Sequence, residues 1–76
     1  MKLQKIKITS LNQPVIIGDF MQVFAQRRID VTNYAFSKLN SGEGLFTIEF
    51  LSDDHVAENV KKKLRTKIDV YDVALN

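Results

Sequence analysis

Residues 40–51 have the sequence NSGEGLFTIEFL, in which a glycine-containing turn cluster precedes the most regular strand pattern of the chain. Phe46, Ile48 and Phe50 fall on alternate positions and share one face, which is the period of a half-buried strand over 45–51. Residues 29–39, before the turn, are rich in β-branched and aromatic side chains and favour a second strand. Together they predict a β-hairpin.

A helical pattern precedes the hairpin, from Pro14 to about Arg28. Apolar residues recur there at intervals of three and four, which predicts an amphipathic helix. Asn12 can cap such a helix, and Pro14 is tolerated in a first turn, where its missing N–H has no helical partner. Arg27 and Arg28 suit the negative end of the helix dipole.

A second helix is predicted after the hairpin. Ser52-Asp53-Asp54 places a capping side chain and acids at its positive end. Its buried face would consist of Val56, Ala57, Val60 and Leu64. Five cations crowd its far end: Lys61, Lys62, Lys63, Arg65 and Lys67. We interpret them as a solvated helix end, with a phosphate-binding face as the alternative.

Strand patterns at 5–9 and 68–75 complete the order βαββαβ. This order predicts an α+β fold of the ferredoxin-like type, a four-stranded antiparallel sheet with both helices on one face. Right-handed crossovers give the spatial strand order 4-1-3-2. The other face of the sheet has no cover within the chain and meets either water or a partner.

The size and composition point to a small domain that associates with others. The chain has 76 residues and no Cys, so we expect one domain, residues 1–76, without disulfides or thiolate metal sites. Domains of this size are marginally stable alone, and we therefore expect a homodimer.

The charge pattern argues against a membrane or secreted protein. The first eight residues alternate polar and aliphatic side chains, whereas a signal peptide needs an unbroken apolar stretch. No apolar run approaches the ~20 residues that span a bilayer. We expect a cytoplasmic protein with no membrane segment.

Catalytic groups are few. The one His, His55, falls in the first turn of the second predicted helix and reads as a solvated surface residue. The neighbouring acids Asp53 and Asp54 read as helix-start residues, and Asp69 and Asp72 lie on or near the exposed side of the last strand. We expect no catalytic residue, no metal site and no cofactor in this chain.

Nucleic acid is not an expected partner either. RNA-recognition domains share this order of elements and stack bases on aromatic residues of the open sheet face. Here the stacking positions carry Lys7, Leu45 and Thr47, and the leading basic position carries Glu43. The net charge of +2 is also small.

Several segments carry a more specific pattern when taken together. They are Asn12-Gln13-Pro14 before a helix, VFAQRRIDV at 23–31, TIEF at 47–50 with SDD at 52–54, and KIDVYDV at 67–73. Their joint spacing resembles the ACT domain, most closely the small subunits of acetolactate synthase (acetohydroxyacid synthase). The similarity extends over nearly the whole chain.

The resemblance implies a regulatory subunit rather than an enzyme. ACT domains pair side by side, extending the sheet or burying its open face. The family's small subunits activate a catalytic subunit of branched-chain amino acid biosynthesis, which holds thiamine diphosphate, Mg²⁺ and FAD, and many confer feedback inhibition by valine. The resemblance places an amino-acid effector at the dimer interface, against the loop formed by Asn12, Gln13, Pro14, Val15, Ile16 and Ile17.

Two residues depart from the family pattern. Val15 stands where the family has a Gly that lets backbone approach the effector closely, so we expect a weak or absent response to valine. Arg28 stands where a Gly ends the first helix, a position that calls for a left-handed residue. The ending directly after the last strand resembles the short, ACT-only small subunits. Two alternatives stay open: an amino-acid sensor of another enzyme, and a ferredoxin-like structural or adaptor module.

Overall fold

The computed structural model describes the backbone of residues 1–76 and every side chain except that of Pro14. The elements are β1 (Lys2–Ser10), a 3-10 turn (Pro14–Ile16), α1 (Ile17–Gln26), β2 (Asp30–Lys38), β3 (Gly44–Ser52), α2 (Asp54–Arg65) and β4 (Val70–Leu75). This is the βαββαβ order predicted from the sequence.

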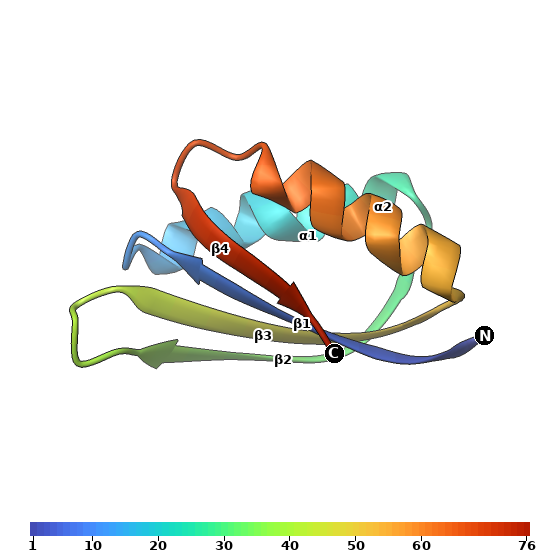
Figure 1. Cartoon of the computed structure of the whole chain (residues 1–76), viewed down its shortest axis with the longest axis horizontal. Coiled ribbons are helices and arrows are strands. Elements are labelled where there is room, and N and C mark those ends of the chain that lie inside the picture. The colour runs from blue at the N-terminus through green and yellow to red at the C-terminus, as the bar shows by residue number, and fades with distance from the viewer.

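The four strands form one antiparallel sheet in the order β2-β3-β1-β4. Both helices lie on the same face of this sheet, and the opposite face is open (Figure 1). The predicted ferredoxin-like fold and the predicted strand order 4-1-3-2 are therefore confirmed.

The core lies between the sheet and the helices. On β3, Phe46, Ile48 and Phe50 are fully buried, as their alternate spacing predicts. Phe20 of α1 meets Phe46 edge to face with ring centroids 5.2 Å apart, and Phe24 meets Phe50 at 5.0 Å. Such paired rings hold α1 in one position over the sheet.

The start of α1 differs from the predicted helix over 14–28. The chain first forms the 3-10 turn, in which the Ile16 amide donates to the Gln13 carbonyl at 3.0 Å. Ile16 then precedes the α-helix, and no side chain caps it, so Asn12 is not the cap of α1. The tighter turn brings Ile16 into the core while Asn12 stays in the loop before it.

The end of α1 is a Schellman motif. The Ile29 amide donates to the Phe24 carbonyl and the Arg28 amide to the Ala25 carbonyl, both at 3.1 Å. Arg28 has φ 53°, so the expectation of a left-handed residue at this position is confirmed. The turn redirects the chain into β2.

The predicted start of the last strand at Ile68 is wrong by two residues. The Val70 amide donates to the Lys67 carbonyl at 3.2 Å, which closes a turn over 67–70. The β-branched Ile68 therefore lies in a loop, and β4 begins at Val70.

A buried polar side chain joins the ends of several elements. Gln4 of β1 is fully buried and donates to the Ser52 carbonyl at 3.3 Å and to Asp54 Oδ1 at 3.0 Å. Its own Oε1 accepts from Asn76 Nδ2 at 2.6 Å. Asp53 completes this corner, because its Oδ1 caps α2 by accepting from the Val56 amide at 2.8 Å.

Candidate functional site

The candidate site is the loop between β1 and α1, which backbone hydrogen bonds hold in place. The Gln13 amide donates to the Leu11 carbonyl at 2.8 Å, and the Leu11 amide donates to the Asp69 carbonyl at 3.0 Å. The second bond ties this loop to the α2–β4 loop, so the two loops form one end of the molecule.

The six predicted site residues lie at different depths. Gln13 and Val15 are exposed, Asn12 and Ile17 are half-buried, and Ile16 belongs to the core. The backbone of Pro14 is part of the 3-10 turn, whereas its side chain lies outside the described residues. The outer surface that this loop offers to a ligand or partner therefore includes Gln13 and Val15.

The loop packs closely against the start of β3. A Cβ on Gly44 would lie 3.4 Å from the Asn12 Cα and 2.8 Å from Cε1 of Phe36. The second distance is shorter than real Cβ contacts, so a larger residue at this position would require the Phe36 ring to shift. The start of β3, at the hairpin end of the sheet, thus packs directly against the backbone of Asn12.

Val15 gives the loop a surface unlike the glycine of the family pattern. Its side chain is 81% exposed. Among the described residues other than glycine, positive φ occurs at Arg28 and Asn76, so the Val15 backbone is ordinary. A branched side chain points outward where glycine would leave the backbone bare.

The neighbouring α2–β4 loop carries further exposed apolar groups. Ile68 is 94% exposed, and Tyr71 at the start of β4 is largely exposed. Tyr71 also lines a hollow of about 280 Å³, together with Arg65, Val70 and Asp72. The sequence pattern assigned Ile68 to a strand, and this surface was missed for that reason.

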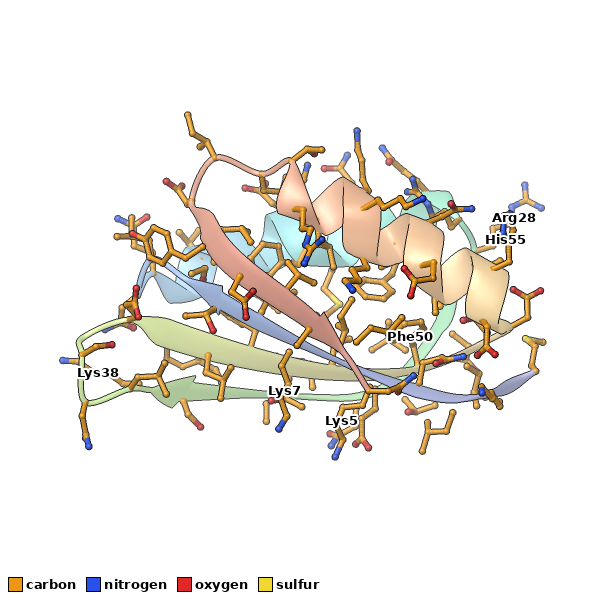
Figure 2. All side chains as sticks on the ribbon, viewed as in Figure 1. Lys5, Lys7, Arg28, Lys38, Phe50 and His55 are labelled. Carbon is orange, nitrogen blue, oxygen red and sulfur yellow. The ribbon has the colours of Figure 1, made fainter. Side chains whose placement is uncertain are left out.

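The groups considered for catalysis are dispersed. His55 lies on the exposed side of α2, with Nε2 3.4 Å from Asn59 Nδ2, as predicted for a surface residue. Figure 2 places it at the same end of the molecule as Arg28. Within the described residues, no three His, Asp or Glu side chains are grouped to hold a metal ion.

The open sheet face lacks a stacking surface at the tested positions. Lys5 and Lys7 point away from the helices there, whereas Phe50 lies between sheet and helices (Figure 2). Phe46 and Phe50 are buried, so neither ring can stack on a base.

β2 lies at an edge of the sheet, as the predicted strand order requires, but its exposure was not predicted. Every residue of this strand except Val31 is exposed. Tyr34 and Phe36 are paired with the core residues Ile48 and Phe46, yet they are 56% and 37% exposed. They lie on the helix side of the sheet but beyond the cover that the helices provide.

Comparison with known proteins gives a clear result only at the level of structure. No family model matches the chain. No curated protein matches it either. The ACT domain of GTP pyrophosphokinase from Chlorobium tepidum superimposes with a TM-score of 0.77 at 15% identity, over 97% of this chain and 96% of that one. The C-terminal domain of the MgtC protein from Mycobacterium tuberculosis gives 0.81 at 11% identity, over 97% and 84%.

These likenesses define the class: the chain has the fold of an ACT domain. Among the similar structures is the acetolactate synthase small subunit from Thermotoga maritima, with a TM-score of 0.86 at 17% identity. The superposition covers 99% of this chain and 47% of that subunit, so the chain spans about half of its length. In the described part of this chain, no helix is long and apolar enough to cross a membrane.

Proposed function

We propose that this chain is a non-catalytic regulatory subunit of acetolactate synthase, which activates the catalytic subunit by contact. The observation that carries the proposal is the superposition on an acetolactate synthase small subunit over 99% of the chain, at a TM-score of 0.86. The joint spacing of the four sequence segments supports the same assignment independently of the coordinates.

In this proposal the chemistry belongs to the partner. Thiamine diphosphate, Mg²⁺ and FAD are held by the catalytic subunit, and this chain supplies a surface. The proposal implies a cytoplasmic complex that serves branched-chain amino acid biosynthesis.

Regulation by contact fits the β1–α1 loop better than regulation by valine does. A ligand's carboxylate and ammonium groups need close approach to backbone N–H and C=O groups, which glycine permits. Val15 is 81% exposed and covers the backbone at the position of the family glycine. We therefore propose a weak or absent valine response.

We further propose that the subunit is a homodimer joined through β2. An edge strand of nine residues presents unpaired N–H and C=O groups that readily pair with another chain. Tyr34 and Phe36 add exposed aromatic area beside that edge. The open sheet face carries Lys5 and Lys7 and is less suited to burial against its own copy.

The ends of β2 are complementary under two-fold symmetry. Tyr34 is the middle residue of the strand, Asp30 begins it and Lys38 ends it. An antiparallel pair of β2 strands centred near Tyr34 places the Asp30 end of one copy beside the Lys38 end of the other. Opposite charges therefore meet at both ends of the joined edge.

The test is the activity of purified acetolactate synthase catalytic subunit with and without this chain. The proposal predicts a several-fold increase in the rate of acetolactate formation, and little change when valine is added. An unchanged rate would contradict the proposal. Tight binding of an amino acid by calorimetry, without activation, would favour a sensor of another enzyme.

A further inference from the structure

Exposed apolar side chains gather at the end of the molecule formed by the β1–α1 and α2–β4 loops. Val15 and Ile68 are almost fully exposed, and Leu11 is also exposed. The hydrogen bond from the Leu11 amide to the Asp69 carbonyl keeps the two loops together. Single exposed apolar residues are ordinary, but several at one end of a small domain indicate a binding surface.

A hollow gives this end a shape that a partner side chain can enter. Its volume is about 280 Å³, and Arg65, Val70, Tyr71 and Asp72 line it. Tyr71 and Arg65 both have an apolar body and a polar end, which is why these residue types are frequent at the centres of protein interfaces. In the sequence, Ile68 lies between two residues that line the hollow, Arg65 and Val70.

The second half of α2 is rich in positive charge, and its last residue, Arg65, lines the hollow. It carries Lys61, Lys62, Lys63 and Arg65, and Lys67 follows it. Across the charged side chains that the structure describes, the single ion pair is Lys2–Asp54, at the opposite end of α2. The cations therefore stay unpaired within the chain, even though Asp69 and Asp72 are nearby in sequence.

We infer that this loop-end surface, defined by Leu11, Val15, Ile68, Tyr71 and Arg65, docks an acidic segment of the catalytic subunit that carries an exposed apolar side chain. The inference rests on the proposed function and names the surface through which activation occurs. The apolar side chain packs against Ile68, and the acidic groups meet the cations of α2, of which Arg65 lines the hollow.

The chemistry of the surface disfavours other occupants. A second copy related by two-fold symmetry would bring the cations of α2 against those of its partner, whereas β2 offers a complementary edge. A free phosphate ion would gain nothing from the aliphatic side chains of Ile68 and Val15, and Asp72 in the hollow would repel it.

The test measures binding of the full chain to purified catalytic subunit by calorimetry at low salt. Ile68→Glu removes an apolar contact, and Arg65→Glu reverses a charge beside the hollow. Leu3→Glu and Lys7→Glu are the matched controls, because both residues are exposed on β1 away from the loops. We expect at least tenfold weaker binding for the first two variants and less than a twofold change for the controls.

The outcomes separate this inference from the proposed function. If the parent chain binds and Ile68→Glu and Arg65→Glu bind equally well, the loop-end surface is wrong and the regulatory proposal stands. Weakening confined to Leu3→Glu and Lys7→Glu would move the interface to the open sheet face and also overturn the inference. If the parent chain itself does not bind, both proposals fail. Circular dichroism of each variant confirms that it is folded.

Discussion

At the scale of single residues, Arg28 adopts a conformation that its residue type disfavours. Its φ of 53° lies in the left-handed region, where a side chain other than that of Gly, Asn or Asp costs about 1 kcal/mol or more. The two hydrogen bonds of the Schellman motif hold it there. The family pattern could predict this conformation, because a glycine is typical of the position.

Replacement of Arg28 by glycine should therefore stabilise the protein. The gain from relieving the left-handed side chain exceeds the entropy lost by glycine, and we expect the free energy of unfolding to rise by about 0.5–1 kcal/mol. Urea denaturation followed by circular dichroism measures it. Lys62→Gly within α2 is the control and should lower the same quantity by about 1 kcal/mol. A destabilised Arg28→Gly would show that the Arg28 side chain makes a favourable contact.

A second residue-scale feature is Asp54, where hydrogen bonds stabilise the charged carboxylate. The hydrogen bond from Gln4 is the main cause that lowers the pKa of Asp54 below its ordinary value of 3.8, and Lys2, whose Nζ lies 3.0 Å away, adds to it. No sequence pattern could show this, because Gln4 and Asp54 are 50 positions apart.

The depressed pKa gives a pH dependence with a definite sign. A carboxyl with a lower pKa in the folded state contributes stability above its unfolded pKa, and this contribution is lost as the pH falls through the folded pKa. The free energy of unfolding should therefore fall between about pH 5 and about pH 3 by a larger amount in the parent than in Asp54→Asn. Glu58→Gln, on the same helix, is the control. Equal losses in the parent and Asp54→Asn would contradict the assignment.

At the scale of elements, the sequence predicts whether each segment is a helix or a strand better than it predicts how exposed that segment is. The alternation in β3 and the acids before α2 mark those elements clearly, and both form where expected. The exposure of β2 could not be predicted, because alternation shows which residues share a face but not how far the helices extend over it. Ile68 was misplaced because a β-branched residue favours a strand until a turn hydrogen bond excludes it.

The proposed pairing of β2 edges makes a charge-swap prediction. Asp30→Lys alone places like charges at both ends of the joined edge, and so does Lys38→Asp. Each exposed ion pair contributes up to about 1 kcal/mol, and symmetry doubles it, so each single variant should weaken the dimer about tenfold or more. The double variant Asp30→Lys with Lys38→Asp should restore association. Sedimentation velocity over a range of concentrations measures the dimer.

A concentration-independent monomer of the parent chain would exclude the homodimer. If the parent dimerises but the single variants dimerise equally well, the interface does not involve the ends of β2. Tyr34→Glu then tests whether the middle of β2 forms the interface. If it does, the variant places two buried charges near the two-fold axis and prevents the dimer from forming; otherwise the dimer is unchanged.

At the scale of the whole molecule, the order of elements and their periodicity were sufficient to predict the fold and the strand order. A βαββαβ chain with right-handed crossovers has few ways to form one sheet, which explains this success. The candidate site was predicted only from the family resemblance, since Asn12, Gln13 and Val15 form no motif that by itself indicates a binding site. The loop-end surface required the structure, because the hydrogen bond from the Leu11 amide to the Asp69 carbonyl joins two loops that are far apart in the sequence.

The proposed regulatory role is tested most directly by titrating the acetolactate synthase catalytic subunit with this chain while acetolactate formation is followed. The proposed role predicts a several-fold rise in rate that saturates as the two chains reach equal amounts and is little changed by valine. It also predicts that Ile68→Glu requires far more of the chain to reach the same rate, whereas Leu3→Glu behaves like the parent. A rate that stays constant at every amount of the chain would exclude the proposed regulatory role.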